Sequence, residues 1–212
     1  MPKIKVPRGN PSLDMTPMVD LAFLLVTFFM LTASFRTDEA VVVDVPSSVS
    51  DKMLPDTNIM QITMDTAGRV FYNIDGPEIR KMTLQEIGKK YNLTFNEDEV
   101  KEFQMMKHYG HPVSKLKDYL NATKGERGRM DKDATGIPCD SVGNQLADWI
   151  SIGRLAHYNY NESKGYDQKT NRLKYAIKAD GRTDYKVIKK IFNTFEKYNI
   201  YTFSLITNLE QE

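Results

Sequence analysis

The strongest constraint on this chain is a stretch of 21 residues, Met15 to Phe35, that is largely apolar and in which Asp20 is the only residue with a formal charge. A helix rises about 1.5 Å per residue, so this stretch would extend roughly 30 Å, the thickness of the hydrocarbon core of a bilayer. The sequence therefore predicts one transmembrane helix over residues 15–35.

Asp20 is the residue of this stretch that needs an explanation. Placing an ionised carboxylate within a bilayer costs about 2.5–3.5 kcal/mol on insertion scales, so an intramembrane aspartate is by default a functional group with a partner. The alternative is that Asp20 lies at the helix entrance and reaches the interface. We favour the functional interpretation.

A cleaved signal peptide is the first rival, because a basic start precedes the apolar stretch. Several features oppose it. The basic region is long and contains prolines and Asp14, and Asp20 lies directly against the apolar run. Cleavage after Ser34 would fit the small-residue rule only loosely. We therefore expect the helix to be retained as an anchor.

The flanking charges predict the orientation. Residues 1–14 hold three basic groups and one acid, whereas Arg36 is outnumbered by the acids that follow it. The positive-inside rule then places residues 1–14 in the cytoplasm. After the predicted transmembrane helix, several prolines and serines predict a linker over residues 36–57, which is followed by one domain over residues 58–212.

Composition limits what this domain can be. Cys139 is the only cysteine, so no internal disulfide can form and a hydrophobic core must hold the fold. We expect Cys139 to be a loop or packing residue, although an intermolecular disulfide stays open. With 29 basic and 28 acidic residues the net charge is +1, which argues against a nucleic-acid partner.

Periodicity in this domain predicts an α+β fold with helices packed on one face of a small mixed sheet. Residues 59–64 and 70–73 alternate as a hairpin, and a helix is expected over residues 83–91, where Thr83 and Glu86 have capping-box spacing.

The end of the domain repeats this alternation of strand and helix. A strand is expected over residues 173–179, a helix capped by Thr183 or Asp184 follows, and residues 201–207 read as a closing strand.

A helical insertion is expected at about residues 92–171. Asn96 and Glu99 can start one helix, a second follows Pro112, residues 124–138 read as a charged loop, and Ser141 opens a third helix. Trp149 in that helix is most economically a core anchor, although a docking surface would look the same.

No catalytic or metal motif is present. The histidines His108, His111 and His157 with Cys139 lack zinc-ligand spacing, and Asp180 and Asp184 are better explained as caps. We expect no enzyme activity, no metal and no cofactor.

A valine-rich run, Val41 to Val45, ends at Pro46. It could be a strand that joins the sheet edge of a sister subunit or of a partner peptide, or simply an extended linker.

Three segments carry a specific resemblance. Asp14-Met-Thr-Pro-Met-Val-Asp20 with the apolar residues up to Ala33 resembles the transmembrane signature of the ExbD/TolR biopolymer-transport family. Val43-Asp-Val-Pro46 resembles the short motif beyond the membrane in that family. Ala179-Asp180 with Thr183-Asp184-Tyr185 resembles the last third of its periplasmic domain. The resemblance covers residues 11–91 and 172–209, and the chain is similar to the enlarged ExbD-like chains of the Bacteroidetes.

The resemblance implies an inner-membrane protein with a cytoplasmic N-terminus and a periplasmic domain. Its partners would be a ring of ExbB-like subunits, a TonB-like protein, and a second copy or another ExbD-like chain as the other half of a dimer. Proton flow through this complex would drive the TonB-like protein to open outer-membrane transporters. A Tol-like envelope motor and a single-pass anchor that presents a binding module are the alternatives.

The resemblance also implies a role for Asp20, which would be the proton-accepting carboxylate. The roles that follow are our own hypotheses from the positions of the residues. Thr27, seven residues later on the same helix face, could contact the proton path. Thr16 and Pro17 would shape the cytoplasmic entrance, and Val43, Val45 and Pro46 would bind a partner.

Overall fold

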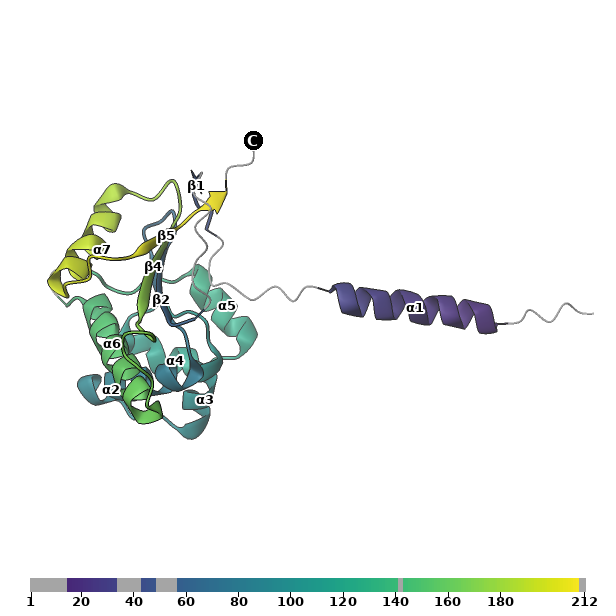
Figure 1. The fold of residues 1–212 in the computed structure, drawn as a ribbon, viewed down its shortest axis with the longest axis horizontal. Coiled ribbons are helices and arrows are strands. Elements are labelled where there is room, and N and C mark those ends of the chain that lie inside the picture. The colour runs from purple at the N-terminus through teal and green to yellow at the C-terminus, as the bar shows by residue number, and fades with distance from the viewer. Residues whose placement is uncertain (1–14, 34–42, 49–56, 141–142, 210–212) are drawn as a thin grey trace, which may run out of the picture. The chain divides into compact units, whose positions relative to one another are not determined.

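The computed structural model describes residues 15–33, 43–48, 57–140 and 143–209. It divides into two compact units, Met1–Asp38 and Glu39–Glu212 (Figure 1). Several predictions concern residues outside the described ones: the cytoplasmic segment 1–14, the end of the apolar stretch at 34–35, the valines at 41 and 42, and the helix start at Ser141. The predicted domain bounds stay predictions.

The first unit contains helix α1, Thr16–Thr32, of 17 residues. Pro17 lies in its first turn, where a missing N–H group leaves no hydrogen bond unmade. The helix ends at Ala33, whose N–H donates to the Phe29 carbonyl at 2.8 Å. Among the residues that the structure describes, no helix combines the length and the apolar character that crossing a membrane requires.

The second unit is built on a four-stranded mixed sheet with the order β3-β2-β4-β5. Its strands are β2 (Ile59–Met64), β3 (Val70–Ile74), β4 (Lys174–Ala179) and β5 (Ser204–Ile206). β2 and β3 form the predicted antiparallel hairpin, and β4 pairs in parallel with β2 and with β5. A separate parallel pair joins β1 (Ser47–Ser48) to β6 (Asn208–Leu209).

The predicted closing strand was too long, because only Ser204–Ile206 of residues 201–207 pair with β4. The residues before Ser204 lead in from the end of α7 and diverge from β4. Alternation of apolar residues predicts which side chains share a face, but it does not predict where two strands separate.

Alternation along β2 separates the two faces of the sheet. Met60, Ile62 and Met64 are completely buried. Their register partners on β4 are Tyr175, Ile177 and Ala179, which therefore lie on the same face. This face is the core side of the sheet.

Helices α6 (Gln145–Lys164) and α7 (Tyr185–Lys197) pack on this core face (Figure 1). Gly153 of α6 lies against Tyr72, and Phe195 of α7 has its ring centroid 5.8 Å from that of Tyr175. The predicted α+β arrangement, with helices on one face of a small mixed sheet, is therefore confirmed.

Helix α2 spans Pro77–Tyr91, so the expected start near Thr83 was wrong. Gly76 with a φ of 93° precedes the helix, and Pro77 begins it. Thr83 is buried inside the helix and donates its hydroxyl to the Ile79 carbonyl at 2.8 Å. The capping-box spacing of Thr83 and Glu86 was coincidental, because a stronger start signal lies six residues earlier.

The insertion is helical, as expected. α3 (Glu97–Met105) starts with the predicted capping box of Asn96 and Glu99. A short 3-10 turn, Val113–Lys115, leads into α4 (Leu116–Asn121). Helix α6 begins at Gln145, so the expected start at Ser141 was too early. Asn144 caps the helix by accepting from the Ala147 N–H at 2.9 Å.

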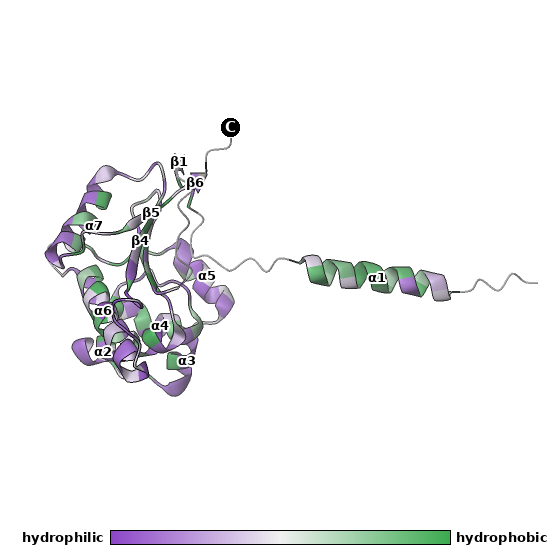
Figure 2. Cartoon of the chain, viewed as in Figure 1, coloured by the Kyte–Doolittle hydropathy of each residue, from purple (hydrophilic) through white to green (hydrophobic). Residues whose placement is uncertain are grey.

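The expected loop over residues 124–138 was wrong in its first part, which forms helix α5, Lys124–Lys132. Thr123 and Glu126 make a capping box at its start. Figure 2 shows α5 as largely hydrophilic, and Asp131 is the one buried residue of the helix. Its charged and glycine-containing sequence concealed the helix, because α5 has no apolar stripe.

The insertion and the sheet share one core. Trp149 of α6 is completely buried, and its ring lies 5.9 Å from Phe103, 5.3 Å from Tyr109 and 5.4 Å from Tyr72. The backbones of Tyr109 and Tyr72 exchange hydrogen bonds of 2.8 and 2.9 Å. The prediction that Trp149 is a core anchor is confirmed.

Candidate functional site

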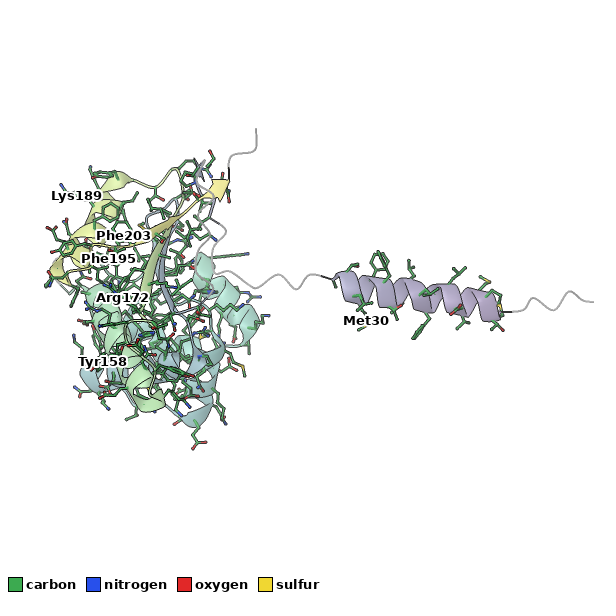
Figure 3. All side chains as sticks on the ribbon, in the orientation of Figure 1. Met30, Tyr158, Arg172, Lys189, Phe195 and Phe203 are labelled. Atoms are coloured by element: carbon green, nitrogen blue, oxygen red, sulfur yellow. The ribbon has the colours of Figure 1, made fainter. Side chains whose placement is uncertain are left out.

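Helix α1 is hydrophobic over most of its length (Figure 2), and none of its residues is buried within its own unit. All of its large hydrophobic residues and the preceding Met15 are more than half exposed: Met15, Met18, Val19, Leu21, Phe23, Leu24, Leu25, Val26, Phe28, Phe29, Met30 and Leu31. Figure 3 shows these side chains around the helix, with Met30 labelled. A helix that is apolar all round is stable only when lipid or other protein covers it.

Asp20 is the only charged residue of this helix, and its side chain is exposed. Seven residues make nearly two full turns, so Thr27 lies on the same face, about 10 Å further along the axis. At that separation the two side chains do not touch. A mobile water or a partner side chain would have to connect them.

The hydroxyl of Thr27 is oriented by the helix itself. It lies 2.9 Å from the Phe23 carbonyl and 3.0 Å from the Leu24 carbonyl, to which it donates. The hydroxyl hydrogen is therefore engaged within the helix, and the oxygen can still accept a hydrogen bond from outside it.

Thr16, Pro17 and Asp20 line one shallow depression at the start of α1, together with neighbouring apolar side chains. Thr16 and Asp20 are four residues apart and so lie one above the other on the helix surface. The structure therefore brings three of the four predicted α1 residues together, and Thr27 lies outside this depression.

The predicted partner-binding segment packs on its own chain. Val43 and Val45 are each 8% exposed. The Pro46 carbonyl accepts from the Asn208 N–H at 3.0 Å, immediately before β1 pairs with β6. Binding of a partner by these residues stays a prediction.

One protein family matches the N-terminal part of this chain. The model of the biopolymer transport protein ExbD/TolR matches residues 7–130, more than half of the chain. This chain belongs to the ExbD/TolR family. Members of this family work with ExbB- or TolQ-type and TonB- or TolA-type partners and are generally associated with the inner membrane. No curated protein and no solved structure matches the chain.

The ExbD/TolR match includes α1, the Val43–Pro46 segment and the sheet hairpin, and it ends in α5. It therefore extends further into the insertion than the resemblance drawn from the sequence, and it does not include residues 172–209. Asp20, Thr27, Thr16 and Pro17 all lie inside the matched residues.

The two aspartates considered as alternative catalytic residues have structural roles in this ExbD/TolR chain. Asp180 accepts hydrogen bonds from the backbone N–H groups of Arg182 and Asp44, both at 3.0 Å, and these bonds hold the pKa of its carboxyl below the ordinary value. Asp184 caps α7 by accepting from the Lys186 N–H at 2.9 Å.

The insertion contains a buried polar cluster that the sequence did not predict. Asp131 of α5 lies 3.1 Å from Nε2 of His111 and accepts from the Tyr119 hydroxyl at 2.9 Å. Burial pushes the pKa of Asp131 upward, but His108 at 3.8 Å and the hydrogen-bonded His111 and Tyr119 outweigh it and hold the pKa at about 2. No local pattern connects these residues, because they come from separate elements.

The side chains considered for zinc do not converge. His157 is buried near Asn58 and Asn161, apart from His108 and His111. Cys139 is a free thiol whose pKa burial raises, which disfavours the reactive thiolate. Within residues 15–33, 43–48, 57–140 and 143–209, no three such side chains are arranged to hold a metal ion.

Proposed function

We propose that this ExbD/TolR-family chain is an inner-membrane subunit of a motor complex that uses the proton-motive force to energise TonB-dependent transport across the outer membrane. Asp20 takes up and releases the proton. The observation that carries the proposal is the isolation of this carboxylate: it is the only charge on a helix that is otherwise apolar apart from three threonines, and it lies within the residues that match the family.

The proposal assigns a location to each part of the chain. Residues 15–35 cross the inner membrane once, residues 1–14 lie in the cytoplasm, and residues 58–212 lie in the periplasm. The exposed apolar surface of α1 supports this assignment, because it needs a cover of lipid and of other helices. An ExbB-like ring and the α1 helix of a second ExbD-like chain supply that cover.

Protonation of Asp20 removes the only charge from the surface of α1. The neutral helix can turn against an apolar wall of the ring, whereas the ionised helix requires a polar neighbour or water. Moving one charge through 100 mV is worth about 2.3 kcal/mol, which is enough to favour one packing of the ring over another. Proton flow is thereby converted into a movement of the ring relative to the α1 helix.

The other predicted residues assist the protonation and deprotonation of Asp20 or transmit the resulting movement, and none of them is catalytic. Thr27 offers an acceptor oxygen on the same helix face, and Thr16 and Pro17 shape the cytoplasmic side of the path. Val43, Val45 and Pro46 form the extended segment by which the periplasmic part engages a TonB-like partner or a second ExbD-like chain. These contacts transmit the movement out of the membrane.

The test is Asp20→Asn, which keeps the size and polarity of the side chain but cannot ionise. Two quantities are measured: co-purification with the ring subunit, and growth on a substrate that requires active transport across the outer membrane. We expect assembly to persist and growth to be lost, while Asp20→Glu retains part of the growth. Normal growth with Asp20→Asn would contradict the proposal and favour an anchored binding module.

Thr27→Val tests the proton path about two helical turns beyond Asp20, and Thr32→Val is its matched control. Both hydroxyls donate to a carbonyl four residues earlier, at 2.9 Å from Thr27 and 2.8 Å from Thr32. Thr32 is twelve residues from Asp20 and so faces about 120° away. We expect reduced transport from the Thr27 variant alone; an equal effect of both variants would remove Thr27 from the path.

A further inference from the structure

An open groove of about 640 Å³ lies in the second unit, where β4 and the segment before β5 diverge. The two strands pair from Ala176 and Ser204 onward, so residues 172–175 and 199–203 line the groove from its two sides. Side chains of α6 and Gln168 complete the lining. The volume falls within the range of about 300–1,000 Å³ that is usual for ligand sites.

The lining of this groove is cationic. Arg154, Arg172 and Lys174 contribute positive charges, and no carboxylate side chain is among the lining residues. None of the three forms an ion pair with another described residue. Arg154 donates one hydrogen bond, of 2.8 Å, to the Tyr198 carbonyl. The groove therefore presents positive charge that the described part of the chain leaves uncompensated.

Arg154 and Arg172 both affect the ionisation of the Tyr175 hydroxyl. Burial raises the pKa of the Tyr175 hydroxyl, and the positive charges of Arg154 and Arg172 oppose that rise. Arg154, Arg172 and Tyr175 all line the groove, although Arg154 comes from α6 and Arg172 from the residues before β4. A single bound segment could contact both.

Aromatic rings border the charges. Tyr158 on α6 is 51% exposed, and Tyr201 on the opposite side of the groove is 72% exposed. Phe203 lies deeper, with its ring 5.3 Å from Phe192. Figure 3 labels Tyr158, Arg172 and Phe203 in this region. Rigid aromatic side chains beside arginines are typical of protein-binding hot spots.

We propose that this groove binds an extended acidic segment of a partner protein. Its carboxylates pair with Arg172 and Arg154, and its apolar side chains pack on Tyr158 and Tyr201. Guanidinium groups bind carboxylates through paired hydrogen bonds, which favours aspartate and glutamate side chains as the ligands. A peptide fits better than a small anion, because the rings lie on both sides of an open groove. This inference concerns the second unit alone and is independent of any role of Asp20.

The test uses the full-length chain in a neutral detergent and a fluorescein-labelled hexapeptide of alternating glutamate and tyrosine. The control peptide carries glutamine in place of glutamate. Fluorescence anisotropy measures the dissociation constant of each. We expect saturable binding of the glutamate peptide and at least about tenfold weaker binding of the glutamine peptide, which corresponds to one lost charge-assisted contact.

Two variants with the same change in net charge separate the groove from general attraction. Arg172→Glu reverses a charge inside the groove, and Lys189→Glu reverses one on the exposed surface of α7, outside it (Figure 3). Both side chains are exposed, so both variants should fold, which thermal unfolding checks. We expect Arg172→Glu to weaken peptide binding by about tenfold and Lys189→Glu to leave it unchanged.

Four results would overturn the proposal. One is the absence of saturable binding, and a second is equal binding of the two peptides. The third is an equal loss from Arg172→Glu and Lys189→Glu, which would indicate attraction by net charge alone. The fourth is complete displacement of the peptide by free glutamate or inorganic phosphate at the same anion concentration, which would make the groove a simple anion site.

Discussion

The backbone N–H of Asp44 donates a hydrogen bond of 3.0 Å to the carboxylate of Asp180, 136 residues later in the chain. In return, the N–H of Gly181 donates to the Asp44 carbonyl at 3.0 Å. These two bonds attach the Val43–Pro46 segment to the turn that follows β4. The segment predicted to bind a partner is thus held on its own chain by a small number of polar contacts and two buried valines.

Asp180→Asn should loosen this attachment. The amide side chain keeps the shape of the carboxylate but loses its charge, and charge-assisted hydrogen bonds are the stronger ones. We expect several-fold faster hydrogen exchange at the Asp44 N–H, measured by mass spectrometry of the peptide that contains it. Asp184→Asn is the control, because asparagine caps a helix about as well as aspartate does. Unchanged exchange with Asp180→Asn would show that the valines alone hold the segment.

Asp131 should make stability depend on acid. Its folded pKa of about 2 lies below the ordinary value of about 3.9, so the ionised form stabilises the fold. That contribution, about 2 kcal/mol, is fully present above about pH 4 and is lost as the pH falls towards 2. Urea titration followed by the fluorescence of Trp149, the one tryptophan, measures the free energy of unfolding.

The matched variants for this prediction are Asp131→Asn and Asp133→Asn. Asp131 is buried, whereas Asp133 is exposed two residues further on. We expect Asp131→Asn to lower the free energy of unfolding at pH 7 and to lower it by about half as much at pH 3, with Asp133→Asn close to the wild type at both. A loss from Asp131→Asn that is the same at pH 7 and pH 3 would contradict the role of the charge.

Gly153 allows α6 to approach the sheet closely, so Gly153→Ala should destabilise the second unit. A Cβ atom there would lie 2.1 Å from the Tyr72 hydroxyl oxygen and 2.8 Å from the Met60 methyl carbon. Overpacking of this kind costs about 1–3 kcal/mol. The same fluorescence-detected urea titration measures the loss.

Two further variants identify the cause of that loss. Tyr72→Phe removes the hydroxyl, which is buried without a hydrogen-bond partner in the structure, so Gly153→Ala should cost less in that background. Gly128→Ala in α5 meets nothing within 4 Å and should be neutral or stabilising. Equal costs of Gly153→Ala in both backgrounds would mean that Tyr72 is not the obstacle.

Short-range sequence patterns correctly predicted the helices and strands that short-range interactions stabilise. The β2–β3 hairpin follows from strict alternation around a turn, and α3 follows from the reciprocal cap of Asn96 and Glu99. The start of α2 was misplaced because a capping-box spacing also occurs by chance inside helices, where Thr83 bonds to its own backbone. Helix α5 was missed because polar contacts, and no apolar stripe, attach it to the core.

The candidate site also contains residues that the sequence could identify and residues that it could not. Asp20 could be identified from the sequence because one charge in an apolar run stands out without any knowledge of the fold. The Asp131 cluster and the cationic groove could not, because each assembles side chains from elements far apart in the chain. Only tertiary packing brings such residues together.

The role of Asp20 as proton carrier is best measured as proton flux through the complex of this chain with its ring subunit, reconstituted in liposomes that contain a pH-sensitive dye. A membrane potential is imposed, and acidification of the lumen is followed for the wild type, Asp20→Asn and Asp20→Glu. We expect flux with the wild type, reduced flux with glutamate, and no flux above that of empty liposomes with asparagine. Flux through Asp20→Asn at the wild-type rate would contradict the assignment of Asp20 as the proton carrier.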